Sequence, residues 1–242
     1  MPAGFSLSGL LALFAVAVGG IVQGSIGFGF ALVAAPVLAL VDPEALPATL
    51  LLLGAPLNLF VAVRERRSID LRGLTSILSG RILGSVAGAG ILVAVPTRFL
   101  SALFGVMILV AVGLTAHRPA FHPRQRLRFL AGIASGVMAT AAAVGGPALA
   151  LVYQDRRGAV LRSTLALFFL FGVSVSLTAL ALAGKVTAAH VALSLQLFPA
   201  LAIGLAASRS VTRLVDGRSL RPVVLAFSSV SALFAILKGI TG

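Results

Sequence analysis

"GIVQGSIGFGFALVAAP", residues 20–36, lies in a segment with no charged side chain from the N-terminus to Asp42. So long an uncharged segment is typical of a chain embedded in a membrane. Four glycines and a proline nevertheless interrupt the stretch, and these residues weaken or end helices. Because unpaired backbone cannot face lipid, such a break has to lie inside the protein or beside a watery cavity. The stretch therefore predicts a broken membrane helix.

The composition places the rest of the chain in a membrane as well. Its 242 residues are 59% hydrophobic and 10% charged, with a mean hydropathy of +1.11. A soluble domain of this size needs far more polar surface. The chain has no cysteine, and its three histidines lack metal-ligand spacing. We therefore expect no disulfide, no thiol chemistry, no metal and no other cofactor.

The basic residues account for a net charge of +13, which by itself could indicate nucleic-acid binding. They fall instead in short loops between apolar segments, which is the pattern of a polytopic membrane protein. We therefore expect the protein to lie in a lipid bilayer and to bind no nucleic acid. Six segments have about the length of one membrane span. These are 47–63, 72–95, 98–116, 160–183, 188–208 and 221–238.

Two other apolar regions, 5–41 and 128–153, contain glycine-rich breaks. If 128–153 crosses the membrane once, the basic residues divide almost evenly between the two sides. If it enters and returns as a hairpin of two short helices, only Arg98, Lys185 and Lys238 lie on the far side. The hairpin satisfies the positive-inside rule. It also predicts that both termini lie outside the cytoplasm. We expect an integral membrane protein, in the inner membrane of a bacterial cell.

An internal repeat supports the hairpin. Gly20-Ile-Val-Gln-Gly24 matches Gly132-Ile-Ala-Ser-Gly136, and a proline, a Thr-Leu pair and three spans follow each block in the same order. The pattern predicts an all-α polytopic protein with one membrane domain of two inverted repeats, 1–116 and 117–242. Each repeat is a broken hairpin (5–41 or 128–153) plus three transmembrane helices. Inverted repeats with broken helices are typical of secondary transporters, although glycine-rich sequences can also match by chance.

The two blocks, "GIVQGSIGFGFALVAAPVLAL" and "GIASGVMATAAAVGGPALALV", resemble the TauE/SafE sulfite-exporter family over essentially the whole chain. The resemblance implies a membrane transporter of sulfite, sulfonates or related small anions. Phe30 and the alanine-rich segment "MATAAAVGG" depart from the family pattern. These departures leave the substrate open more than the fold.

Arg81 is the most informative single residue. It lies about ten residues, or roughly 15 Å, into its span, where an arginine is costly to insert. All six acidic residues lie in loops or at the ends of spans, so no carboxylate is available at this depth. Arg81 is therefore expected to bind an anionic substrate by its charge and forked hydrogen bonds. The alternative is that it caps the carbonyl groups of a broken helix, and both roles can coexist.

The glycine breaks suggest where an anion would meet the backbone. Half-helices that begin after the breaks point free N–H groups and positive dipole ends at a cavity, whereas close helix packing is the alternative role of the glycines. Gln196 follows the start of its span much as Arg81 does, so the two are expected to be counterparts. The candidate substrate-binding residues are Arg81, Gln23, Ser25, Gly27, Gly29, Asn58, Gly145, Gly146 and Gln196. Four hydroxyl residues are weaker candidates because hydroxyls mostly bond to their own helix: Ser79, Thr140, Ser174 and Ser176.

These features together predict a secondary transporter that moves a small anion, sulfite or an organosulfonate, by alternating access. An anion channel of the same fold is the first alternative. A membrane enzyme or assembly factor is the second, and the lack of any catalytic constellation argues against it. A proton relay is not expected without an acidic residue or histidine inside the membrane. A homodimer is compatible with the sequence.

Overall fold

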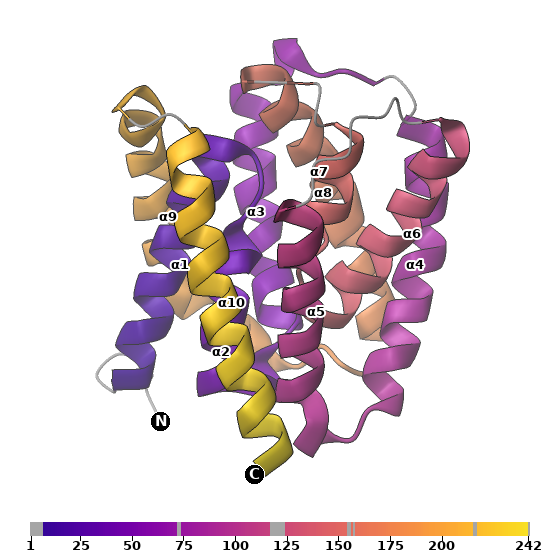
Figure 1. Cartoon of the computed structure of the whole chain (residues 1–242), viewed down its shortest axis with the longest axis vertical. Helices are drawn as coiled ribbons and strands as arrows, with labels where there is room; N and C mark the ends of the chain where they lie inside the picture. The colour runs from indigo at the N-terminus through magenta and orange to yellow at the C-terminus, as the bar shows by residue number, and fades with distance from the viewer. Residues whose placement is uncertain are drawn as a thin grey trace.

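The computed structural model describes residues 7–71, 74–116, 124–153, 156, 158–214 and 217–241. Every regular element among them is a helix, as the sequence predicts (Figure 1). The long elements are α1 (Leu7–Ile26), α2 (Phe30–Val41), α3 (Ala48–Arg64), α4 (Leu74–Ala94), α5 (Leu100–Ala116), α6 (Gln125–Ala142), α7 (Gly146–Val152), α8 (Gly158–Leu182), α9 (Ala188–Leu214) and α10 (Gly217–Thr241). Three short 3-10 helices connect some of them: η1 (Pro43–Ala45), η2 (Arg66–Ser68) and η3 (Thr97–Phe99). Arg72, Arg118, Asp155, Arg157 and Asp216 lie outside the described residues.

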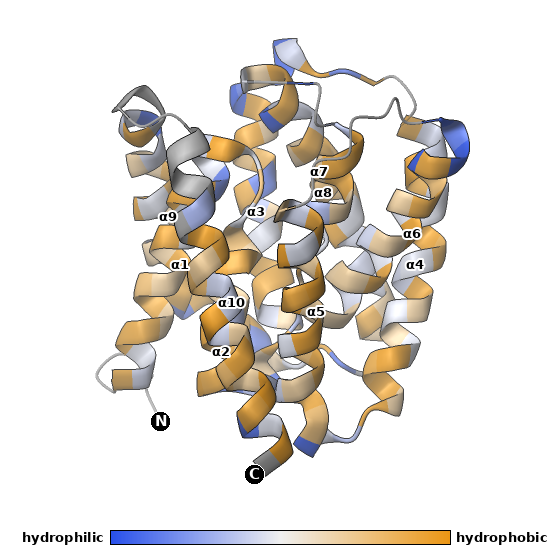
Figure 2. Cartoon of the chain, in the orientation of Figure 1, coloured by the Kyte–Doolittle hydropathy of each residue, from blue (hydrophilic) through white to orange (hydrophobic). Residues whose placement is uncertain are grey.

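The outer surface of the bundle suits a lipid environment. Five helices are long and apolar enough to cross a membrane. Large apolar side chains such as Phe14, Val86 and Leu195 are exposed on the outside. Hydrophobic residues follow the lengths of the helices, and hydrophilic residues gather mostly at the end away from the two termini (Figure 2). The protein is an integral membrane protein, and its two termini lie at the same end of the bundle (Figure 1).

Both glycine-rich regions are broken where the sequence predicts. In the first, α1 stops at Ile26 and α2 begins at Phe30, because Gly27 and Gly29 adopt φ values of 101° and 119° that favour glycine. In the second, Ala143 adopts a φ of 62° and α7 begins at Gly146. The arms of this second hairpin are unequal, with 18 residues in α6 and 7 in α7. The expectation of two short helices is therefore correct only for α7.

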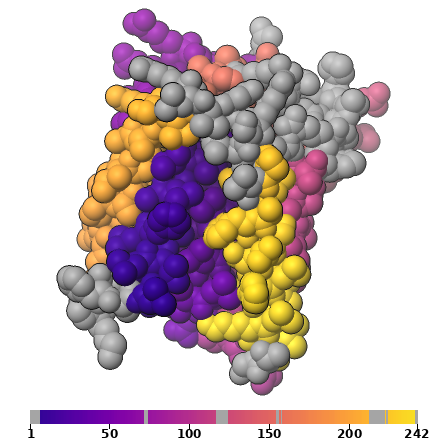
Figure 3. Space-filling model, turned by 60° about the vertical axis from the view of Figure 1, so that its left-hand side comes forward, coloured from indigo at the N-terminus to yellow at the C-terminus, as the bar shows by residue number. Residues whose placement is uncertain are grey.

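The closest helix pairs each join one helix of residues 1–116 to one helix of residues 117–242. Helix α1 packs on α9 and α6 packs on α4, while α3 packs on α8 and α5 on α10. Figure 3 shows α1 on the surface between α9 and α10. Glycines make the closest approaches: a Cβ on Gly84 would lie too close to Ile133 of α6, and a Cβ on Gly204 would meet Ala17 of α1. These pairings are what two repeats would require, and the inverted repeat and its boundaries stay predictions.

Candidate functional site

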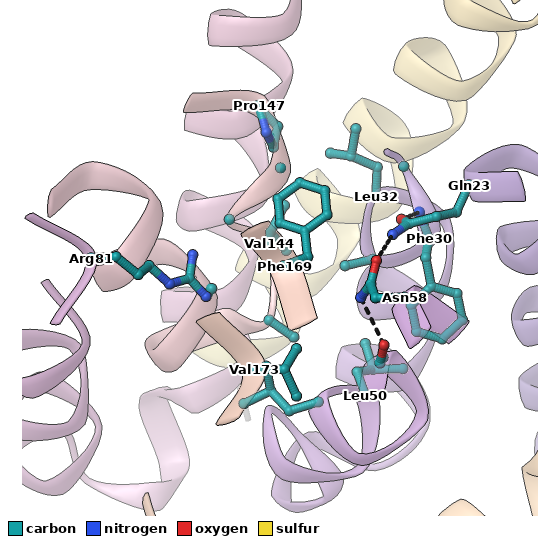
Figure 4. Close-up of a pocket in the computed structure, with 18 residues that line it drawn as sticks. Gln23, Phe30, Leu32, Leu50, Asn58, Arg81, Val144, Pro147, Phe169 and Val173 are labelled. Carbon is teal, nitrogen blue, oxygen red and sulfur yellow. Dashed lines mark hydrogen bonds between the residues drawn. The ribbon is translucent and has the colours of Figure 1, made fainter. Parts of the chain in front are cut away.

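A cavity of about 60 Å³ lies between the two helix breaks. It has room for roughly four to five water molecules. Its lining comes from both breaks, from the first turn of α2 and from α3, α4 and α8 (Figure 4). The lining residues are Gln23, Gly29, Phe30, Ala31, Leu32, Leu50, Leu51, Gly54, Asn58, Arg81, Ala139, Ala143, Val144, Gly145, Gly146, Pro147, Phe169 and Val173.

Arg81 forms one side of the cavity and is almost completely buried, with 1% of its surface exposed. Its Nη1 donates to the carbonyl oxygen of Ser135 at 2.8 Å and to the hydroxyl oxygen at 2.5 Å. Its Nη2 donates to the Ser176 hydroxyl at 3.4 Å, and its Nε has no partner among the described residues. Gly172 leaves the space that the guanidinium occupies, since a Cβ there would lie 2.7 Å from three of its atoms. Arg81 thus binds to α6 directly and to the second break through the Ser135 hydroxyl, and it keeps an unused donor.

A pair of neutral amides forms the other side of the cavity (Figure 4). Gln23 Oε1 accepts from the backbone N–H of Phe30, the first residue of α2, at 3.0 Å. Gln23 Nε2 donates to Asn58 Oδ1 at 2.9 Å, and Asn58 Nδ2 donates to the carbonyl oxygen of Gly54 at 2.7 Å. Each amide nitrogen carries two hydrogens, so each can donate a second bond. The pair therefore fixes the start of α2 and retains donor capacity beside the cavity.

Six of the nine predicted site residues line this cavity. They are Gln23, Gly29, Asn58, Arg81, Gly145 and Gly146. Ser25 lies outside it, and its hydroxyl donates to the carbonyl oxygen of Ser208 in α9 at 3.3 Å. Gly27 also lies outside it and packs against the backbone of Arg162 in α8. Ser25 and Gly27 thus act in helix contacts and in the turn at the break rather than in the cavity wall.

Gln196 is on the exposed outer face of α9, so the expectation that it faces the cavity as the counterpart of Arg81 is wrong. The helix contacts give the reason. Gly80 packs on Phe129 and Gly204 packs on Ala17, which places Leu205 in the position that Arg81 occupies in the other pair of helices. Gln196 lies nine residues before Leu205, which is roughly two and a half turns and hence the opposite helix face. The lengths of α4 and α9 differ, so counting from the start of each span misaligned them.

The hydroxyl residues divide into two groups. Ser79 and Ser174 are exposed and bond to carbonyls of their own helices, at Ser76 and Leu170. The hydroxyl oxygens of Thr140 and Ser176 instead lie 2.7 Å apart, and the Ser176 hydroxyl accepts from Nη2 of Arg81. Ser135 holds Arg81 most directly, although it is not among the predicted site residues. Its match with Gln23 in the repeat would have identified it.

A separate cluster of charged side chains lies beyond the first break. Glu65 pairs with Arg64 at 3.0 Å and with Arg162 at 2.9 Å, and all three side chains are mostly buried. Arg64 Nη2 also donates to the carbonyl oxygen of Gly24 at 2.9 Å. Arg64 and Arg162 thus bind carbonyl groups in the last turn of α1. The four described acidic residues are Asp42, Glu44, Glu65 and Asp70, and none of them lines the cavity.

This arrangement can bind a small anion. It combines one buried cation, amide donors and the first turn of α2, whose backbone N–H groups carry partial positive charge. Among the described residues, no group of three or more metal-ligating side chains is present. A family model described as "Sulfite exporter TauE/SafE" matches residues 11–235. No curated protein and no solved structure matches the chain.

Proposed function

Because that match spans nearly the whole chain, the protein belongs to the TauE/SafE sulfite exporter family of membrane transporters, and we propose that it is a secondary transporter of a small oxyanion, sulfite or a short organosulfonate. One observation carries the proposal. Arg81 lies beside the second helix break, lines the cavity, and has no acidic partner among the described residues. A buried cation without a counter-ion is costly, and an anionic ligand removes that cost.

The size of the cavity supports a small substrate. A cavity of about 60 Å³ holds only a few water molecules, which suits a small anion such as sulfite or methanesulfonate. Larger organic anions need the walls to move apart. Phe169, Val173 and Leu50 supply apolar contacts beside the polar groups, and these suit a short alkyl substituent.

Burial of the lining groups supports alternating access over an open channel. Arg81, Gln23 and Asn58 are each less than a tenth exposed, which suits a site that opens to one side of the membrane at a time. Flux through such a protein saturates and shows counter-transport, whereas flux through a channel of the same fold does not. The charged cluster at Glu65 lies beyond the first break and adds to the closure at that end.

The predicted orientation favours export. We place both termini outside the cytoplasm of a bacterial cell, with the arginine-rich end of the bundle inside. An inside-negative membrane potential then contributes about 2.3 kcal/mol per negative charge per 100 mV to outward movement. No coupling ion is required for that direction.

The proposal is tested with purified protein. Thermal-shift measurements against sulfite, methanesulfonate, sulfate and acetate should show stabilisation by a small oxyanion, by mass action. Arg81→Gln should abolish this stabilisation and the uptake of labelled anion into proteoliposomes. Arg98→Gln is the matched control, because Arg98 stacks on Phe99 at the end that carries the termini and does not line the cavity. Equal stabilisation of wild type and Arg81→Gln would overturn the proposal.

A further inference from the structure

The cavity contains a single formal charge. Of the eighteen residues that line it, Arg81 alone is ionisable, and its polar partners across the cavity, Gln23 and Asn58, are neutral. The hydroxyls that surround the guanidinium, Ser135 and Ser176, are neutral as well. A ligand in this cavity therefore meets one full positive charge and several uncharged donors.

The other arginines near the first break do not add to this charge. Arg64 and Arg162 share the carboxylate of Glu65 and donate to carbonyl oxygens at the end of α1, and neither lines the cavity. The first turn of α2 adds only a partial charge, equivalent to about half an elementary charge at a helix N-terminus. The cluster keeps a net charge of +1, but none of its three residues lines the cavity, so Arg81 is the one full charge that a ligand there contacts directly among the described residues.

Resting on the proposed transport function, we propose that the cavity selects its substrate by charge, accepting monoanions such as hydrogen sulfite or methanesulfonate and rejecting dianions such as sulfate and fully deprotonated sulfite. A monoanion beside Arg81 forms a neutral pair among lining groups that are mostly buried. A dianion in the same place leaves one buried negative charge without a counter-charge. Buried charges that lack a partner are strongly unfavourable, and neutral hydrogen-bond donors compensate them only in part.

The apolar side chains that line the cavity also favour a monoanion over a dianion. Phe169, Val173, Leu50 and Phe30 offer no donor to additional anionic oxygens. They do offer contact to a methyl group or to another weakly hydrated part of a ligand. A monoanion with one uncharged side can place its oxygens beside Arg81 and its uncharged part against the apolar side chains. A dianion has to place charged oxygens against hydrocarbon.

Sulfite provides a sharp test because it exchanges one proton near neutral pH. The affinity of wild-type protein for total sulfite is measured by titration from pH 6 to pH 9, with methanesulfonate, a monoanion throughout, as the reference. Above the second pKa of sulfurous acid, we expect the sulfite affinity to fall about tenfold per pH unit, in step with the fraction of hydrogen sulfite. The affinity for methanesulfonate should stay constant, and equimolar sulfate should not displace it.

Each other result is decisive. A sulfite affinity that stays constant or rises with pH, or displacement of methanesulfonate by sulfate, overturns the charge selection and leaves the transport function standing. Absence of binding of both sulfite and methanesulfonate at every pH overturns the proposed function and the selection with it. Arg81→Lys keeps the charge and should keep the pH pattern, whereas Arg81→Gln should lose binding of both anions. The wild-type titration stands even if either variant fails to fold.

Discussion

Arg81 and Ser135 connect helix α4 to the second break through one short chain of hydrogen bonds. Nη1 of Arg81 donates to the hydroxyl oxygen of Ser135, and that hydroxyl donates to the carbonyl oxygen of Gly145 at 2.8 Å. The same nitrogen also donates to the Ser135 carbonyl oxygen. Charged donors make the stronger hydrogen bonds, and this one holds both the cation and the backbone turn at the cavity. Ser135 is thus a positioning residue for Arg81.

Ser135→Ala should weaken both stability and anion binding. The change leaves the carbonyl oxygen of Gly145 without its donor, and one unsatisfied buried group costs about 1–3 kcal/mol. It also frees the guanidinium to move away from the cavity. Thermal unfolding in detergent and sulfite titration measure the two effects. Ser174→Ala is the matched control, because the Ser174 hydroxyl is exposed and bonds to its own helix; similar losses in both variants would contradict this role.

Gly172→Ala should displace Arg81 without removing it. An added Cβ would lie 2.7 Å from the Cζ, Nε and Nη2 atoms of the guanidinium, so the side chain must shift. We expect a loss of anion affinity of about tenfold, or roughly 1.4 kcal/mol, measured by titration. Gly113→Ala is the control, since nothing lies within 4 Å of a Cβ at that helical position. It should keep the affinity and gain stability, because alanine favours helix over glycine; an unchanged affinity in Gly172→Ala would contradict the prediction.

Much of this fold and site can be predicted from the sequence, because membrane insertion leaves few alternatives. The uncharged run and its glycines locate the break near Gly27 and Gly29, and the depth of Arg81 in its span identifies the central charge. These inferences depend on local composition and on the cost of burying polar groups in lipid. The two breaks and Arg81 accordingly meet at one cavity.

The remaining features depend on helix register, which local composition does not specify. Counting from the start of each span makes Gln196 the counterpart of Arg81. The contact between Gly204 and Ala17 instead gives that position to Leu205. Ser135 is not among the predicted site residues. Its role follows from the close packing of α6 on α4, which brings its hydroxyl to Arg81.

Glu65→Gln should destabilise the protein. The carboxylate holds Arg64 and Arg162 together, and the side chains of the three residues are only 12–15% exposed. Without it, two guanidinium groups face each other in a poorly solvated place, with an expected cost of about 1–3 kcal/mol, between the values for surface and buried pairs. Thermal unfolding at low and high salt measures the loss. Glu44→Gln is the control, because Glu44 is exposed and forms no ion pair with a described residue; equal unfolding temperatures for the two variants would rule out this role.

Ala143→Gly should stabilise the second break. Ala143 adopts a φ of 62°, a left-handed conformation that costs a residue with a Cβ about 1–2 kcal/mol and costs glycine little. Ala141→Gly is the matched control, since Ala141 lies in helix α6 and is fully buried. That change should lower stability by about 1 kcal/mol or more, because glycine weakens a helix and leaves a small void. Thermal unfolding of both variants should therefore show shifts of opposite sign, and a decrease in both would mean that the turn at Ala143 is not strained.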